Sequence, residues 1–267
     1  MSIVTTSTPS SSGSNEETSA VAERTARRCA ETALFMRDHV LSLVSHDLRS
    51  PLNAIHSWAY VLDRKIDTND ATAQRALEGI RNGVEQQVKL LESIVDTTRA
   101  ETKALVLKRA PFALRPLLDE TIGDVRDALA VRRGVALELN SPLAAQRMDG
   151  DRERLAAALW LLVTFAVEAS ASGVTVTLDA DVDASTFRAT VAWQATPAAL
   201  TDAALPHVLE NFARAQATQP REASRISWVL GLCKRIAEAH DGAFEQGGWA
   251  DDGQPTTLKL RVPLAGA

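Results

Sequence analysis

The pattern of apolar and polar positions gives the first half of the chain a helical character. Between Val21 and Lys108 the sequence is rich in Ala, Glu, Arg and Leu, and one set of apolar residues recurs at steps typical of a single helix face: Leu41, Val44, Leu48, Ile55 and Leu62. A second set follows the same pattern: Leu77, Ile80, Val84, Val88, Leu91 and Val95. The polar residues 67–70 between them suit a turn and a helix start. The pattern therefore predicts a long helical hairpin.

The pattern changes after Lys108, where stretches typical of helices and strands follow one another. Helices are expected around Leu114–Leu129, Arg152–Ala169 and Ser227–His240. Strands are expected at Val135–Leu139, Val174–Leu178, Phe187–Trp193 and Thr257–Val262. Such a mixture predicts an α+β domain with helices on one face of a sheet.

These patterns divide the chain into three parts. Residues 1–23 begin with a Ser/Thr-rich stretch that offers little apolar surface to bury, so we expect a disordered leader there. Residues 24–107 form the helical hairpin and residues 108–267 the α+β domain. Two amphipathic helices cannot cover their own apolar faces, so two hairpins are expected to pair as a four-helix bundle in a homodimer.

Composition narrows the classes of function. The chain has 29 Lys and Arg against 34 Asp and Glu, a net charge of -5, which argues against a nucleic-acid binder or a binder of anionic membranes. Its two Cys cannot build a disulfide framework or a four-ligand zinc site. The sequence shows neither an apolar run of membrane-spanning length nor a secretory pattern, so a cytoplasmic location without membrane association is expected.

Residues 45–55, with the sequence SHDLRSPLNAI, carry the chemistry of the hairpin. On a helix, His46 lies about 140–200° away from the apolar face, so its imidazole is expected to point to solvent. An exposed His followed by an acid suits reversible nucleophilic chemistry, because histidine side chains in general titrate near neutrality and a carboxylate orients the ring or takes its proton. Pro51 removes one backbone hydrogen bond and is expected to bend the helix.

This string closely resembles the phosphoacceptor box of the two-component sensor histidine kinase family. The resemblance implies that His46 is phosphorylated, that Asp47 assists it, and that Ser50 takes the place of the Thr or Asn that positions a water in receiver dephosphorylation. It also implies response regulator receiver domains as partners, and a hybrid histidine kinase as a further one. The exposed residues around His46 would form the partner surface: Arg37, Arg49 and Asn53.

The likeness extends from about residue 24 to residue 264 and implies an α/β sandwich of the kinase ATPase type. Asp151-Arg152-Glu153-Arg154-Leu155 sets the register of its nucleotide boxes. The two family Asn, the second of which holds Mg²⁺, fall on Leu161 and Phe165. The Asp and two Gly of the next box fall on Trp193, Ala195 and Pro197. The glycine-rich phosphate lid falls on Ser227, Trp228 and Val229.

These replacements remove the chemistry that Mg-ATP requires. Magnesium prefers oxygen ligands, which a phenyl ring lacks, and an indole is better suited to filling an adenine pocket than to recognising adenine. Without its glycines, the lid cannot easily form the open turn that cradles phosphates. We therefore expect no cofactor on this chain, with Mg²⁺ carried by the partner receiver domain.

An intact phosphoacceptor box in a chain with an altered nucleotide site favours one function and leaves two others open. The favoured function is a histidine phosphotransferase that passes phosphoryl between receiver Asp residues through His46 without ATP. It resembles dimeric phosphotransferases of sporulation and cell-cycle phosphorelays. The first alternative is a pseudokinase scaffold or receiver phosphatase. The second is a divergent autophosphorylating histidine kinase.

Overall fold

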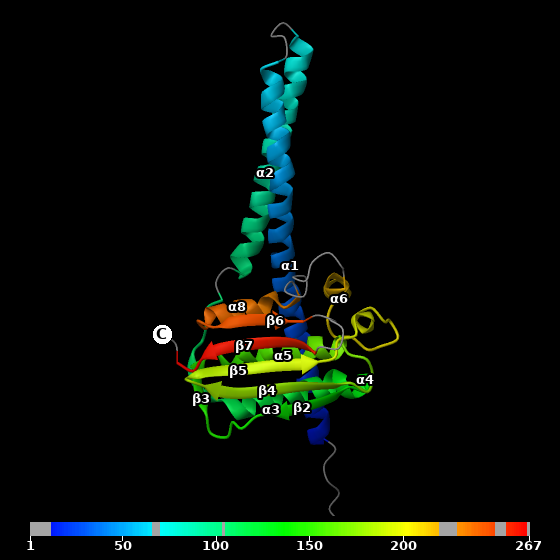
Figure 1. Cartoon of the computed structure of the whole chain (residues 1–267), viewed down its shortest axis with the longest axis vertical. Coiled ribbons are helices and arrows are strands. Elements are labelled where there is room, and N and C mark those ends of the chain that lie inside the picture. The colour runs from blue at the N-terminus through cyan, green and yellow to red at the C-terminus, as the bar shows by residue number, and fades with distance from the viewer. Residues whose placement is uncertain (1–11, 66–69, 103–104, 219–228, 249–254, 266–267) are drawn as a thin grey trace, which may run out of the picture. The chain divides into compact units, whose positions relative to one another are not determined.

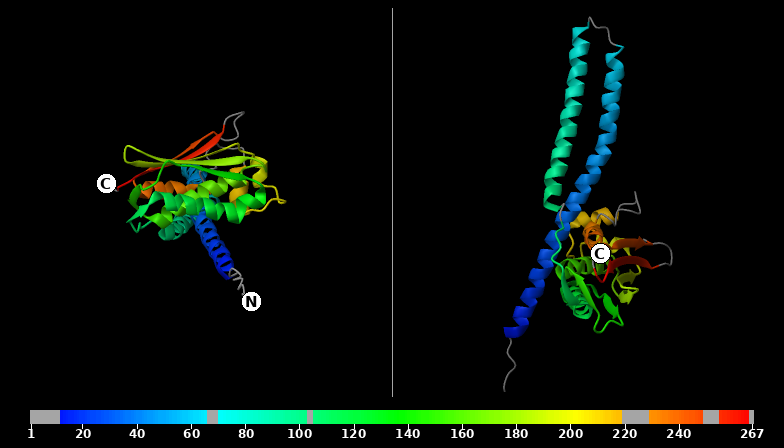
Figure 2. Two further views of the ribbon diagram at one scale, coloured as in Figure 1. Left: turned by 90° about the horizontal axis from the view of Figure 1, so that it is seen from below. Right: turned by 90° about the vertical axis from the view of Figure 1, so that its left-hand side faces the viewer.

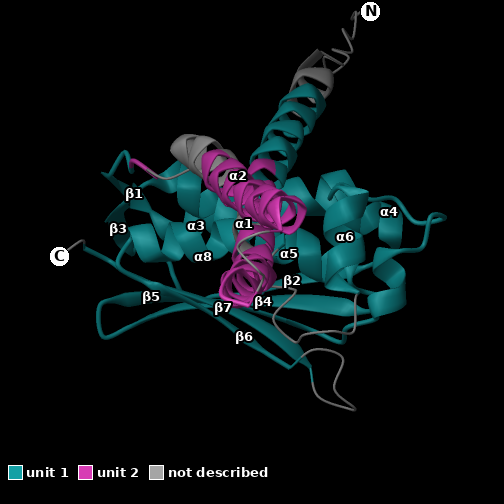
Figure 3. Cartoon of the chain, turned by 90° about the horizontal axis from the view of Figure 1, so that it is seen from above, with its two compact units in different colours: residues 1–33, 107–267 teal, residues 34–106 magenta. Residues whose placement is uncertain are grey.

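The computed structural model describes residues 12–65, 70–102, 105–218, 229–248 and 255–265. The chain divides into two units (Figure 3), one of residues 34–106 and one that joins residues 1–33 to residues 107–267. Helix α1, Ser12–Asp63, contributes to both units. The sequence assigned residues 24–107 to the hairpin, whereas the structure groups the first part of this helix with the α/β domain.

The start of α1 differs from the disordered leader expected at residues 1–23. The helix begins at Ser12, and residues 1–11 lie outside the described residues. Helix α3, Leu114–Val125, supplies the reason, because its Asp124 is only 3% exposed and binds two arginines of α1. Arg24 Nη2 lies 2.7 Å and Arg28 Nη1 2.8 Å from its carboxylate oxygens. These tertiary contacts stabilise the first part of α1 as a helix, although its sequence has too little apolar surface to predict one.

The predicted helical hairpin is confirmed (Figures 1 and 2), and its second helix is α2, Ala71–Thr102. Asp70 caps α2, since its Oδ1 accepts hydrogen bonds of 3.0 Å from the backbone N–H groups of Thr72 and Ala73. The rest of the expected turn, residues 66–69, lies outside the described residues. Among the helices that the structure describes, none is both long and apolar enough to cross a membrane.

The apolar face of α1 that the sequence analysis placed in the bundle interior is exposed in the single hairpin. The hairpin buries a neighbouring face of the helix instead. Four of the five members of the exposed face are 43–48% exposed: Val44, Leu48, Ile55 and Leu62. The fifth, Leu41, is half-buried. Between residues 44 and 62, the buried positions of α1 are Ser45, Leu52 and Ala59, each three residues before a member of the exposed face and therefore about 60° around the helix. They share the interior with Leu77 and Val84 of α2. The exposed face needs another cover, and a second hairpin is the cover that we predict.

The α/β domain contains a five-stranded sheet in the order β2, β4, β5, β7, β6. The strands are β2 Ala136–Asn140, β4 Thr175–Asp183, β5 Thr186–Trp193, β7 Thr256–Pro263 and β6 Ala243–Gly247. Strands β2 and β4 are parallel, and the other pairs are antiparallel. Helices α3, α5 (Arg152–Glu168) and α8 (Gly231–Ala239) lie on one face (Figure 2). The predicted α+β class and its layering are confirmed.

Several short elements complete the domain. A two-stranded sheet pairs β1, Ala110–Ala113, with β3, Arg147–Gly150. After α3 the chain continues through a π-helical turn η1, Arg126–Ala130, into α4, Val131–Arg133. The others are the 3₁₀ turn η2, Pro197–Leu200, and α6, Asn211–Ala217.

The main core lies between the sheet and α5. Along β5, alternate side chains are fully buried: Phe187, Ala189, Val191 and Trp193. Helix α5 is buried around almost its whole circumference, as expected for a helix enclosed by a sheet and its neighbouring helices. Asp151 starts this helix by accepting a hydrogen bond of 3.1 Å from the Arg154 N–H.

A buried histidine joins the end of α8 to the start of α5. His240 Nδ1–H donates to the Ile236 carbonyl at 2.8 Å, and Nε2 accepts the Asp151 N–H at 3.0 Å. This pair of bonds requires a neutral ring, since Nε2 acts as an acceptor. Burial lowers the pKa of His240, and the nearby Arg109 adds to this effect, while the Ile236 carbonyl, Asp151 and Asp241 oppose it.

Stability is therefore expected to fall as the pH falls through the range below 6.5, the ordinary pKa of His. The unfolded chain binds this proton more tightly than the folded chain, so the contribution of His240 is complete above that value and is lost below it. Urea unfolding at about pH 7.5 and about pH 5.5 measures the loss, and a His240→Gln variant should lose less between the two values. Equal losses in the two proteins would contradict this prediction.

Candidate functional site: the phosphoacceptor helix and the α5–β5 core

His46 lies on α1 with its imidazole open to solvent. The side chain is 83% exposed, and the neighbouring Asp47 side chain is 81% exposed. His46 Nδ1 lies 3.4 Å from Asp47 Oδ1. When Nδ1 carries the proton and donates to this carboxylate, the lone pair of Nε2 faces outward. The arrangement presents a nitrogen nucleophile that a partner can approach directly.

The other predicted site residues of the hairpin share this exposed setting. Arg37, Arg49, Ser50 and Asn53 are exposed on α1. Arg49 Nη2 lies 3.4 Å from Glu92 Oε1 of α2, so the guanidinium is directed across the hairpin. Ser50 stands one helical turn after His46 and therefore on a neighbouring part of the surface. The sequence did not reveal Glu92, because the register between the two helices comes only from the structure.

Pro51 lies inside α1, and the helix continues through it. The proline has no N–H to donate to the Asp47 carbonyl one turn before it. The backbone directly after His46 therefore lacks one helical hydrogen bond.

Three predicted nucleotide positions are buried in the core of the α/β domain. Leu161 and Phe165 on α5 are 0% exposed, and Trp193 at the end of β5 is 2% exposed. The rings of Phe165 and Trp193 pack edge to face, with centroids 6.2 Å apart and planes at 85°. Val229 is also buried. Ser227 and Trp228 lie outside the described residues.

The remaining two positions lie where β5 leads into η2. Ala195 is half-buried, and Pro197 is the first residue of η2. Neither has the conformational freedom of the glycine that the family places there.

Leu161, Phe165 and Trp193 lack the polar groups that the resemblance assigns to Mg-ATP binding at these positions. Leu161 and Phe165 offer no oxygen ligand for Mg²⁺, and Trp193 offers no carboxylate for the adenine amino group. The indole N–H of Trp193 is buried and has no hydrogen-bond partner among the described residues. Within the same described ranges, no group of three or more His, Cys, Asp or Glu is placed to hold a metal ion.

A buried carboxylate at the end of α5 organises the segment that follows η2. Glu168 is 0% exposed, and its Oε1 accepts the Val208 and Leu209 N–H groups at 2.7 and 2.8 Å. Its Oε2 lies 3.1 Å from His207 Nδ1 and 3.7 Å from Arg214 Nε. Sequence reasoning missed this network, because Glu168 is the last residue of an apolar helix and its partners lie about forty residues later.

Arg133 supports the same region from α4. Its Nη2 donates to the Glu168 carbonyl at 2.8 Å, and its Nη1 donates to the Pro206 carbonyl at 2.8 Å. Burial lowers the pKa of Arg133, although the Glu168 carboxylate opposes this effect. The guanidinium remains charged at neutral pH, because the pKa of an arginine starts so high.

Comparison with known proteins identifies relatives of this chain. The family "His Kinase A (phospho-acceptor) domain" matches residues 36–103, which include His46. The crystal structure of a histidine kinase from Burkholderia phymatum STM815 is 77% identical and has a TM-score of 0.76, with 91% of this chain and 99% of that chain covered. This chain belongs to the histidine kinase family. The resemblance drawn from the phosphoacceptor box is thereby confirmed.

More distant members of the histidine kinase family are longer than this chain. The Autoinducer 2 sensor kinase/phosphatase LuxQ of Vibrio parahaemolyticus serotype O3:K6 is 25% identical over 244 residues, which cover 90% of this chain and 28% of LuxQ. The signal transduction histidine-protein kinase BaeS of Escherichia coli K12 is 27% identical over 210 residues, which cover 78% of this chain and 43% of BaeS. The chain thus spans less than half the length of either protein.

Proposed function

We propose that this protein is a histidine phosphotransferase of a two-component phosphorelay. His46 accepts phosphoryl from the aspartyl phosphate of one receiver domain and passes it to the Asp of another. The protein works as a homodimer, does not use ATP, and binds its receivers through the surface around His46. These receivers belong to response regulators or to a hybrid histidine kinase.

One contrast between the two units carries this proposal. The hairpin keeps an open nucleophile with an acidic neighbour 3.4 Å away. In the α/β domain, the positions that would bind metal and adenine are occupied by Phe165 and Trp193, in edge-to-face contact at 6.2 Å. A phosphotransferase needs the first feature and has no use for a nucleotide site.

The phosphoryl transfer requires few catalytic groups from this chain. His46 Nε2 attacks the phosphorus of the aspartyl phosphate, the N–P bond forms, and the P–O bond to the Asp carboxyl breaks. The electron pair of that bond leaves with the Asp carboxylate. Asp47 accepts the Nδ1–H hydrogen bond and stabilises the positive charge that develops on the ring. The receiver domain supplies Mg²⁺ for the phosphoryl oxygens, and the second transfer is the reverse of the first.

Two alternatives have their own support. A pseudokinase that binds a receiver and promotes its dephosphorylation is favoured by Ser50, which is exposed one turn from His46 and carries a hydroxyl able to orient a water. An autophosphorylating kinase is favoured by the relatives, several of which are named as kinases. It would have to hold Mg-ATP without the Asn and Asp side chains of the family boxes.

An ATP-labelling experiment separates the proposal from the kinase alternative. The purified full chain is incubated with γ-labelled ATP and Mg²⁺, beside a family kinase that retains the Asn and Asp boxes. We expect label on the control kinase and none on this chain, and we expect calorimetry to detect no ATP binding. Label on His46 from ATP alone would refute the proposal.

A further inference from the structure

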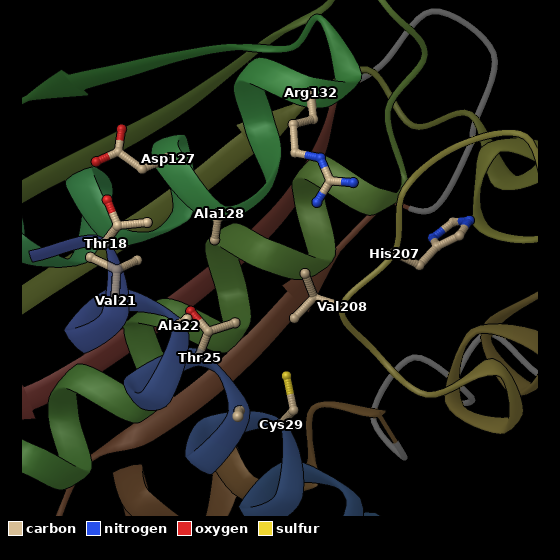
Figure 4. Close-up of a pocket in the computed structure, with 11 residues that line it drawn as sticks. Thr18, Val21, Ala22, Thr25, Cys29, Asp127, Ala128, Arg132, His207 and Val208 are labelled. Atoms are coloured by element: carbon tan, nitrogen blue, oxygen red, sulfur yellow. The ribbon is translucent and has the colours of Figure 1, made fainter. Parts of the chain in front are cut away.

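A cavity of about 770 Å³ lies within the unit that joins the first part of α1 to the α/β domain. Its walls come from three places: α1, the η1–α4 turn, and the segment held by Glu168 (Figure 4). The cavity contains none of the phosphoacceptor residues and none of the altered nucleotide positions. The volume falls in the range of sites that bind small molecules.

The cavity wall is largely apolar. The apolar lining residues are Val21, Ala22, Ala26, Ala128 and Val208. Cys29 is also part of the lining, and burial raises the pKa of its thiol to about 12, with Glu168 and Glu210 adding to the rise. The part of the wall around Cys29 therefore disfavours a negative charge, and an apolar group gains by entering it.

Arg132 supplies an unbalanced positive charge at this wall. In the part of the chain that the structure describes, its guanidinium forms no hydrogen bond or ion pair. Figure 4 shows it directed toward the space that Val208 and Cys29 also face, whereas the Asp127 carboxylate is directed away. An arginine fork matches a carboxylate in geometry and charge.

His207, at the rim of the cavity, is held by two contacts. His207 Nε2 lies 2.9 Å from the Asp202 carbonyl oxygen, and its Nδ1 lies 3.1 Å from Glu168 Oε2. Asp127 and Ala128 belong to η1, a π-helical turn of a kind that occurs often at functional sites. The position of His207 is thus set by the fold.

We propose that this cavity binds a small amphipathic carboxylate. Its carboxylate pairs with Arg132, and its apolar body contacts Ala128, Val208 and the facing side of α1. Because the ligand touches both α1 and the α/β domain, its binding stabilises the docking of the first part of α1. This site is separate from the proposed phosphotransfer at His46.

Calorimetry on the full chain tests the proposal with two probes of equal tail length, decanoate and decyltrimethylammonium, each below its micelle concentration. We expect decanoate to bind and the cationic probe not to. Arg132→Gln should weaken decanoate binding by about tenfold or more, since it removes a hydrogen bond between charged groups. Arg126→Gln, which changes an exposed arginine of η1 outside the cavity, should leave binding unchanged.

A second variant and a second readout locate the bound probe. Ala26→Trp fills the cavity from an exposed position of α1 and should abolish binding in a protein with an unchanged circular dichroism spectrum. Decanoate should also slow the alkylation of Cys29 in the natural chain but not in Arg132→Gln. Equal binding of both probes, an equal loss in the two arginine variants, or no binding of decanoate would overturn the proposal.

Discussion

Replacing His46 with Ala is expected to abolish phosphoryl uptake from a phosphorylated receiver, with a loss on the order of a thousandfold or more. Alanine has no nucleophile, and no side chain in the proposal substitutes for the imidazole. Stability should change by less than about 0.5 kcal/mol, because the His46 side chain is 83% exposed. Transfer of radiolabel from a phospho-receiver to this chain, followed by gel electrophoresis, measures the rate.

His56→Ala is the matched control for this variant, since His56 lies ten residues later on α1 and faces a different direction. It should accept label at nearly the rate of the natural chain. Asp47→Asn should retain the nucleophile but slow the transfer, because it removes the carboxylate that orients the ring. If His46→Ala still acquired label, another residue would be the acceptor, and the assignment would fail.

Replacing Glu168 with Ala should lower the free energy of unfolding by about 3–5 kcal/mol. The change leaves two buried N–H groups, those of Val208 and Leu209, without their acceptor. It also leaves the nearby Arg214, 3.7 Å away in the natural chain, without its carboxylate partner. Urea unfolding monitored by circular dichroism measures the loss.

Glu138→Ala is the control for this variant, because Glu138 is exposed on β2. Its effect should stay within about 0.5 kcal/mol. Glu168→Gln should lie between the two, since an amide oxygen still accepts the two N–H groups but carries no charge. A loss below about 1 kcal/mol for Glu168→Ala would show that the network does not hold the segment after η2.

The long elements of the fold could be predicted from the sequence because their residue patterns reflect burial. The predictions at Arg152–Ala169 and Phe187–Trp193 match α5 and β5 closely, because α5 carries a long apolar run and β5 an alternation of apolar and polar residues that a core must bury. Strands β1 and β3 have four residues each, too few for a periodic pattern. The start of α1 depends on Asp124, which lies 100 residues after Arg24. Local sequence carries no sign of such a contact.

In the candidate site, too, the features set by neighbouring residues could be predicted from the sequence, and the contacts between distant residues could not. The motif around His46 is continuous, so it could be recognised from the sequence together with its exposure. The register of α5 and β5 placed Phe165 and Trp193 at nucleotide positions, but their contact required the folded sheet. The cavity beside Arg132 combines residues from α1, η1 and the segment near His207, so only the tertiary structure brings it together.

In the proposed function, phosphoryl reaches His46 from a receiver and not from ATP. The most direct measurement mixes the full chain with a purified, labelled phospho-receiver in the absence of nucleotide and follows the label over time. We expect label on this chain that is acid-labile and alkali-stable, as is typical of a phosphoramidate, and its later movement to a second receiver. Label that passes only to water, with none on His46, would contradict the proposed phosphotransfer and favour a receiver phosphatase.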